Sequence, residues 1–354
     1  MKNTMLTCLI FFMITFSLVS SAEPILYVVT GPNNTMLAID TQKDEIMSEI
    51  GELENAHGLA GNKNTPYLVA GSLSKSENIN TKENLASKPI TMSDDAHKRH
   101  HTAAGDEKGN TGKSYVSIIH PEHGHVMNRI EVVGITHHTA VSPDGKVAIA
   151  AHSQNGGVSV IDLNQSKVIT FIKTGQVPNF VVFNDGGQFA YVTNSGSGSI
   201  SVIDTKKWSV IKDIKVGSGP AHLFLDKPTN VLYVVNVLGG SVSAINLTDK
   251  KIVSTYQVGK SPHGISMSSD GKWLFVSNKG SDTLTRINIR NGNVKNLTLK
   301  PAPYHLEVIP NSRKLYVSSR KQAKIWVIDQ LAMNILKEIN IGFGVAHQMV
   351  LISR

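Results

Sequence analysis

Cysteine is nearly absent from this 354-residue chain, whose only example is Cys8. Cys8 lies in an N-terminal segment that has an early lysine, an apolar run over residues 5–19 and small residues at its end, which is typical of a secretory signal peptide. We predict that residues 1–22 form this signal and are cleaved after Ala22. The mature chain, 23–354, would then have no disulfide, no thiolate metal ligand and no CxxCH motif for attaching haem.

Long hydrophobic runs are also missing after this segment. The apolar run itself is short for a membrane span, and no stop-transfer pattern follows it, so we expect no stable membrane anchor. An exported chain without cysteine suits the bacterial periplasm, with secretion as the alternative. We therefore expect a periplasmic protein.

Familiar catalytic motifs are absent as well. The sequence has no G-x-S-x-G elbow, no Walker loop and no H-E-x-x-H, so it gives no support for hydrolases or nucleotide-binding enzymes that use them. The net charge is +8 at pH 7, but the basic residues are dispersed apart from one local cluster at 97–101. Because no basic stripe is interleaved with aromatic residues, we expect no nucleic-acid partner, and only a weak preference for anionic small molecules remains.

A regular repeat is what the sequence does contain. Proline recurs at Pro178, Pro220, Pro262 and Pro303, at intervals of 42, 42 and 41 residues. Equivalent positions without proline extend the same spacing in both directions. A period of this length is typical of propellers and related repeat folds.

Within each repeat, short runs of β-branched and aromatic residues alternate with turns rich in Gly, Asn, Asp and Ser, as half-buried antiparallel strands require. No long stretch shows helical periodicity, so the pattern predicts an all-β chain. The second strand of successive repeats falls at 148–152, 190–194, 232–236, 274–278 and 315–319, and the third at 158–162, 200–204, 242–246, 284–288 and 325–329.

The two ends of the chain complement each other. Residues 25–31 and 36–40 look like the second and third strands of a repeat that lacks its first strand, whereas residues 346–353 look like a first strand with nothing after it. Pairing the N- and C-terminal strands would complete one blade and close a ring. Counting first strands predicts a seven-bladed β-propeller of four-stranded antiparallel blades, forming a single domain over 23–354.

The motif AYVTN (190–194) followed by GSISVID (198–204), with glycine–proline spacers between repeats, resembles the YVTN-type β-propeller repeat family. The resemblance covers essentially the whole mature chain and implies a seven-bladed fold with a central channel. It implies little about function, because propellers serve as enzymes, binders and scaffolds alike.

One blade is interrupted between its second and third strands by a segment at 73–113. This segment is rich in Ser, Lys and Asn and poor in large apolar residues, so we expect it to be flexible. Loops of this kind lie on the face where first strands begin, and long insertions are often functional. The insertion carries His97, His100 and His101, which are candidate accessory metal ligands on that face.

Histidine recurs at the start of the first strand in six of the seven blades. First strands line the channel of a propeller, so we expect these side chains to converge at its mouth. The set consists of His57, His137, His138, His222, His263, His305 and His347. Each histidine could instead cap a turn or hydrogen-bond a backbone carbonyl. Duplication of the repeat could also have multiplied a histidine that has no binding role. Against this, the rest of the repeat has diverged while histidine recurs, which favours a metal or cofactor site.

An all-imidazole site suits copper, zinc, nickel or iron, whereas calcium and magnesium need oxygen ligands. Seven imidazoles exceed the four ligands of structural zinc, so either one ion selects a few of them or several copper ions use nearly all. We expect copper, with zinc as a weaker alternative. His152 replaces the Asn found at this point in other repeats and is a candidate accessory residue on the same face.

A channel-mouth set of seven histidines that includes the adjacent pair His137 and His138 is similar to the catalytic propeller of nitrous-oxide reductases. That resemblance implies a multinuclear copper site, with single ligands at the other five positions, but it covers the propeller alone and not the cupredoxin domain of those enzymes. Electrons would have to come from a separate periplasmic redox protein, and a metallochaperone is the alternative partner. Whether the protein is an enzyme stays open. If it is an enzyme, we expect a copper-dependent oxidoreductase.

Two other functions remain open from the sequence. The first is a metal-free propeller that binds a protein or ligand at its channel mouth. The second is a tetrapyrrole-binding propeller, because the site is also similar to those of haem-d1-binding propellers, which use channel histidines but usually have eight blades. Our leading hypothesis is metal binding, delivery or redox chemistry at the histidine ring.

Overall fold

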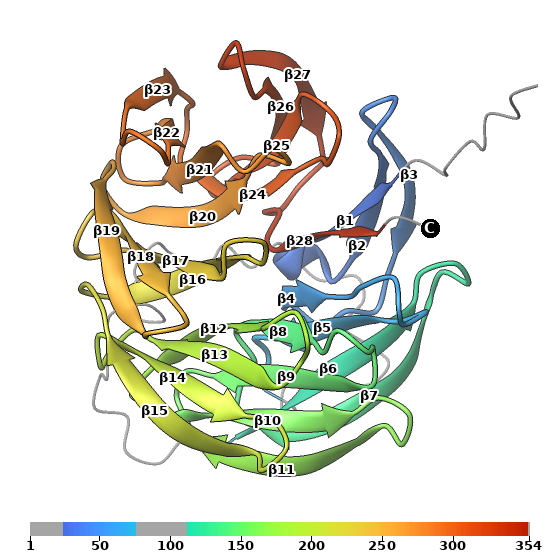
Figure 1. Cartoon of the computed structure of the whole chain (residues 1–354). Helices are drawn as coiled ribbons and strands as arrows, with labels where there is room; N and C mark the ends of the chain where they lie inside the picture. Colours follow the sequence, from blue (N-terminus) through green and yellow to red (C-terminus); the bar gives the residue numbers. More distant parts are fainter. Residues whose placement is uncertain (1–23, 76–111, 353–354) are drawn as a thin grey trace, which may run out of the picture.

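The computed structural model describes residues 24–75 and 112–352. Within these ranges, seven four-stranded antiparallel sheets are arranged around a central channel, as Figure 1 shows. The predicted all-β, seven-bladed propeller is therefore confirmed. The described part also has one short 3₁₀ turn, η1 (Gly31–Asn33). It contains no helix with the length and apolarity needed to cross a membrane.

Each blade presents its first strand to the channel and its fourth strand to the outside. The first strands are β4 (Ala56–Ala60), β8 (Thr139–Val141), β12 (Pro178–Phe183), β16 (Pro220–Asp226), β20 (Pro262–Met267), β24 (Pro303–Val308) and β28 (Met349–Ile352). The second strands are β1 (Ile25–Val29), β5 (Leu68–Ser72), β9 (Val147–His152), β13 (Phe189–Asn194), β17 (Val231–Asn236), β21 (Trp273–Asn278) and β25 (Lys314–Ser319).

The outer half of each blade follows the same order. The third strands are β2 (Met36–Asp40), β6 (Lys113–His120), β10 (Gly157–Asp162), β14 (Ser199–Asp204), β18 (Ser241–Asn246), β22 (Thr283–Asn288) and β26 (Lys324–Asp329). The fourth strands are β3 (Glu45–Ile50), β7 (His125–Val133), β11 (Lys167–Lys173), β15 (Ser209–Lys215), β19 (Lys251–Gln257), β23 (Val294–Thr298) and β27 (Asn334–Asn340).

The expectation of half-buried strands is wrong for the middle of the blades. Five of the six residues of β13 are buried, as are five of the six of β14, whereas most of β15 is exposed. The reason is that each blade is packed between two neighbouring blades, so both faces of its inner strands meet apolar surfaces. Only the fourth strand reaches beyond this contact.

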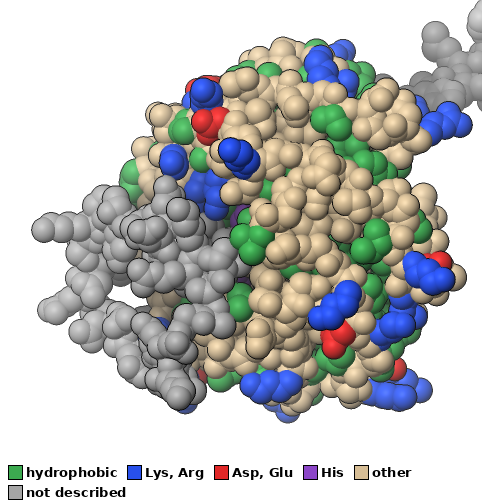
Figure 2. Space-filling model, turned by 90° about the vertical axis from the view of Figure 1, so that its left-hand side faces the viewer, with side chains coloured by type: hydrophobic (Ala, Val, Ile, Leu, Met, Phe, Trp, Pro, Cys, Tyr) green, Lys and Arg blue, Asp and Glu red, His purple; other side chains and the backbone are tan. Residues whose placement is uncertain are grey.

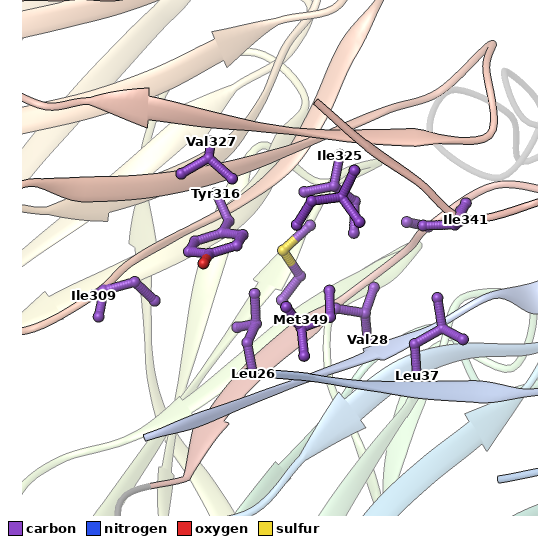
Figure 3. Packing of buried hydrophobic residues seen from close by; sticks show 12 residues of the cluster. Leu26, Val28, Leu37, Ile309, Tyr316, Ile325, Val327, Ile341 and Met349 are labelled. Atoms are coloured by element: carbon purple, nitrogen blue, oxygen red, sulfur yellow. The ribbon is translucent and has the colours of Figure 1, made fainter. Parts of the chain in front are cut away.

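The two ends of the described chain close the ring. β28 pairs antiparallel with β1, with Ile352 opposite Ile25 and Met349 opposite Val28. The sheet β28–β1–β2–β3 therefore takes its first strand from the C-terminal end and its other strands from the N-terminal end, as predicted. Figure 3 shows Met349, Leu26 and Val28 of this seam packed against residues of the preceding blade, such as Tyr316.

Asparagine at the end of the second strand ties that strand to the third. The side-chain amide of Asn236 donates to the Ser243 hydroxyl at 2.9 Å, and Asn194 makes the matching bond to Ser201, also at 2.9 Å. The spacer glycine in front of the blade makes room for this group: a Cβ at Gly217 would lie 2.5 Å from the Cγ atom of Asn236. This explains why glycine recurs three residues ahead of Pro178, Pro220 and Pro262.

Both ends of the long insertion lie near the start of β4. Leu73, just after β5, donates its backbone N–H to the carbonyl of Asn55 at 3.1 Å. The hydroxyl of Ser114 in β6 donates to the carbonyl of Ser72 at 3.1 Å. The chain thus leaves and re-enters the blade on the face where first strands begin, as expected. Most of the 73–113 segment, including residues 76–111 with its histidines, lies outside the described residues, as does the predicted signal peptide.

Packing at the seam between β1 and β28 predicts that truncation of Met349 lowers stability more than truncation of an exposed methionine. Met349 is 6% exposed and belongs to the closing cluster, whereas Met127 on β7 is 49% exposed. We expect Met349→Ala to lower the free energy of unfolding by about 2–5 kcal/mol and Met127→Ala by no more than about 0.5 kcal/mol. Denaturant unfolding of both variants measures the difference. Equal costs would show that the seam does not contribute to stability as the packing indicates.

Candidate metal centre

The seven predicted histidines all lie at one end of the channel. Four belong to first strands: His57 to β4, His222 to β16, His263 to β20 and His305 to β24. The other three, His137, His138 and His347, lie just ahead of β8 and β28. None of the seven side chains is more than 4% exposed. The repeat has therefore placed seven imidazoles at one buried level.

A β-bulge at the start of the first strand explains how different repeat positions reach this level. In β24 the pairing with β25 shifts between Pro303 and Leu306, so that Tyr304 and His305 together lie opposite a single residue, Ser318. The Ser318 hydroxyl accepts the backbone N–H of His305 at 3.1 Å. A bulge redirects side chains and breaks the strict alternation of faces. The same shift occurs in β12, β16 and β20.

The histidine rings contact one another around the channel. The centroids of His57 and His347 are 4.4 Å apart, and those of His57 and His137 are 4.5 Å apart. On the other side, His222 lies 4.2 Å from His263. His305 lies 4.9 Å from both His222 and His263 and 5.8 Å from His57. His305 therefore contacts both halves of the cluster.

Two trios have ring nitrogens close enough to share an ion. They are His57, His138 and His305, and His222, His263 and His305. Within each trio the candidate ligand atoms lie within 4.8 Å of one another. Both trios include His305, so neither can form a three-imidazole site without it.

Hydrogen bonds at the adjacent pair define one tautomer. The Nδ1 atom of His138 lies 3.0 Å from the carbonyl oxygen of Asn179 and 2.7 Å from Nδ1 of His137. A carbonyl can only accept, so His138 carries its proton on Nδ1 and has its lone pair on Nε2. An outer carbonyl that holds the ring in this way is the usual support of a metal-binding histidine.

Burial favours the neutral form of three ring histidines, His57, His305 and His347. It is the main cause that lowers the pKa of His57 and of His305 well below the usual value, and the neighbouring histidines lower it further. Burial also lowers the pKa of His347 to about 3, with a smaller effect from the positive charge of Arg320. Neutral imidazole is the form that binds metal ions, so the lowered pKa values of these three histidines favour their ligand form at neutral pH.

Two residues that the sequence did not single out belong to this site. Tyr304 is fully buried and stacks on His263, with ring centroids 4.0 Å apart and an interplanar angle of 18°. The guanidinium of Arg320 lies 5.6 Å from the centre of the Tyr304 ring. A sequence signal existed for Tyr304, because it directly follows the repeat proline, as His263 does. Arg320 follows the second strand, at the position that Lys279 occupies one blade earlier.

His152 has a role different from that of an accessory ligand. Its Nδ1 lies 3.1 Å from the carbonyl of Ile135 and its Nε2 lies 2.8 Å from the Ser159 hydroxyl. Both ring nitrogens are therefore used within its own blade. The ring takes the place of the asparagine that ties the second strand to the third elsewhere. The other accessory candidates, His97, His100 and His101, lie outside the described residues.

Comparison with known proteins identifies the fold family. The model of a family described as "Lactonase, 7-bladed beta-propeller" matches residues 70–334. A search of curated proteins found no match to the chain.

Solved structures share the fold at low sequence identity. A putative 6-phosphogluconolactonase from Bacteroides fragilis superposes with a TM-score of 0.71 and 16% identity, covering 94% of this chain and 99% of its own. A putative 6-phosphogluconolactonase from Bacteroides uniformis gives 0.70 and 14%, covering 93% and 99%. Hydrazine synthase from Kuenenia stuttgartiensis gives 0.64 and 14%, covering 90% and 92%. At these identities the likeness extends to the fold alone.

His152 predicts an acid-sensitive contribution to stability. Burial lowers its pKa to about 4, from 6.5 in an exposed histidine. The unfolded chain therefore binds a proton that the folded chain does not, and stability falls as the pH drops from above 6.5 towards 4. Asparagine does not titrate, so we expect His152→Asn to gain about 2 kcal/mol relative to the native protein between pH 7.5 and pH 5.

Unfolding of the metal-free proteins in denaturant at the two pH values measures this change. Any cost of the smaller side chain is the same at both pH values and cancels in the comparison. If the difference in unfolding free energy between the native protein and His152→Asn did not vary with pH, His152 would not be a buried, neutral histidine that links β9 to β10.

Proposed function

This chain belongs to the lactonase family of seven-bladed β-propellers, and we propose that it is a member that binds a transition metal, with copper as the ion, through the histidines at its channel mouth. The observation that supports this most strongly is the pair of imidazole trios that share His305. Their candidate ligand atoms lie close together in a buried environment. Imidazole ligands suit a soft or borderline divalent ion, whereas calcium and magnesium ions need oxygen ligands.

The ligand set favours copper over a structural zinc ion. Zinc in structural sites is held by four ligands in a closed tetrahedron, whereas seven imidazoles meet here. The Nε2 atom of His305 and the Nδ1 atom of His347 are buried and make no hydrogen bond to the described residues. Buried polar nitrogens without partners are costly, and a bound ion would remove that cost.

In this role the protein acts as an exported copper-binding protein, in metal delivery or in redox chemistry. The likeness of the histidine set to that of nitrous-oxide reductases supports a site with more than one copper ion. An electron-transfer protein or a metallochaperone of the periplasm would be the partner. The chain contributes the ligands, holds their tautomers through carbonyls such as that of Asn179, and keeps bulk water from the imidazoles by burial.

A second candidate function is lactone hydrolysis assisted by a bound metal, which membership of the lactonase family favours. Three imidazoles with an open fourth position are the ligand set of hydrolytic zinc sites, where the ion lowers the pKa of bound water to about 7. Either trio could supply such a set. Copper delivery and lactone hydrolysis differ in the metal retained and in whether a lactone substrate is consumed.

Metal content tests the proposal directly. Protein isolated from the periplasm is expected to contain copper, and His305→Ala is expected to lose most of it, because both trios depend on His305. His125 on β7 is exposed and is not one of the ring histidines, so His125→Ala serves as the matched control. Elemental analysis gives the metal-to-protein ratio, and thermal melting confirms that both variants are folded.

Other outcomes of the same experiment separate the alternatives. Zinc in place of copper, together with hydrolysis of a lactone panel that His305→Ala abolishes, would favour the second candidate. A Soret band in the visible spectrum would favour a tetrapyrrole. Native protein that contains no metal and takes up none, or full copper retention by folded His305→Ala, would overturn the proposed site.

A further inference from the structure

Arg320 is a buried positive charge at the mouth of the channel. Its side chain follows β25 and is 7% exposed, and its backbone N–H donates to the carbonyl of Ala302 at 2.8 Å. The Nε atom is buried and makes no hydrogen bond to the described residues. Other arginines of the described chain form ion pairs, as Arg313 does with Asp329. Arg320 forms no ion pair with the described residues. Arg320 thus has no carboxylate partner within residues 24–75 and 112–352.

The Arg320 side chain lies beside two neutral groups of the described chain, Tyr304 and His347. Its guanidinium lies over the ring of Tyr304, whose hydroxyl it hydrogen-bonds, and its charge acts on His347. The Lys279 ammonium approaches the same tyrosine ring, 5.7 Å from its centre. In Figure 2, lysine and arginine side chains gather beside the place where histidine is visible at the surface. The described side of the mouth therefore combines neutral imidazoles with a cationic rim.

Such an arrangement costs free energy unless an anion completes it. Removing a guanidinium from water is costly, and proteins normally offset this cost with a carboxylate and further hydrogen bonds. The cation–π contact with Tyr304 offsets only part of this cost. The equivalent positions of three other blades carry Ser153, Ser195 and Val237, so the propeller does not need a cation here.

We propose that Arg320, with Lys279 and the Tyr304 ring beside it, forms a binding site for a small carboxylate or similarly planar oxyanion. A guanidinium presents two parallel N–H donors that match the two oxygens of a carboxylate, and Lys279 adds a second positive charge. The neighbouring His347 places this anion at the edge of the histidine cluster. The inference goes beyond the proposed metal function and applies to the metal-free protein.

Formate is a suitable probe because it is the smallest carboxylate and has a single observable proton. Saturation-transfer NMR on chelator-treated native protein at low ionic strength is expected to show formate binding, which added acetate should compete away. Arg320→Met keeps an unbranched side chain and removes the charge, so we expect formate affinity to fall at least tenfold. Arg320→Lys keeps the positive charge but loses the two parallel N–H donors, so we expect formate affinity to fall severalfold.

Lys321→Met is the matched control. It removes the same charge at the next residue, which is exposed, so a general effect of net charge would weaken both variants alike. The proposal requires Lys321→Met to bind formate within twofold of the native protein. No saturation transfer in the native protein, or equal affinity in native, Arg320→Met and Arg320→Lys proteins, would overturn it.

Melting curves establish that each variant is folded, and should Arg320→Met fail this check, the comparison of native protein with Arg320→Lys decides. Because every measurement uses metal-free protein, failure of the anion site leaves the copper proposal standing. Failure of the native protein to bind copper, or full copper retention by His305→Ala, likewise leaves the formate result unaffected.

Discussion

Seven sheets that share one axis impose a constraint on which the whole site depends. Each first strand starts at the same end of the channel, so the residue at that position meets its six equivalents whether or not they attract one another. Placing histidine there in most blades forces imidazoles 4–5 Å apart, as at His222 and His263. Imidazoles can pack this closely only where most of them are neutral, because like charges at such distances repel strongly in a buried site.

The same constraint separates two kinds of polar residue. Asn194, Asn236 and His152 lie at the ends of second strands, where the amide N–H groups of the two asparagines and both ring nitrogens of His152 are hydrogen-bonded. The ring histidines lie on the channel, where the blade leaves ring nitrogens such as Nε2 of His305 without a protein partner. The amide donors and ring nitrogens at the strand ends hold the blade together, whereas the ring nitrogens on the channel are the ones with which a ligand could bond.

Much of this could be predicted from the repeat, because a fixed spacing translates directly into a fixed position around the axis. The blade count, the closure and the level of the histidines follow from it. The bulge does not: His263 follows its proline directly and His305 follows at two residues, which in a regular strand would point them to opposite faces. The repeat gives the position of Tyr304, directly after its proline, but not its stacking on His263. Arg320 looks like ordinary divergence until packing places its charge beside His347.

The seam between β1 and β28 has a mechanical consequence. Ile25, where β1 begins, lies opposite Ile352, where β28 ends, so the two ends of the described chain leave the sheet side by side. A force that pulls these ends apart would therefore peel the ladder open one hydrogen bond at a time instead of shearing all of them together. The bond from the backbone N–H of His347 to the carbonyl of Val29, 2.8 Å long, lies at the opposite end of this seam and would be among the last to break.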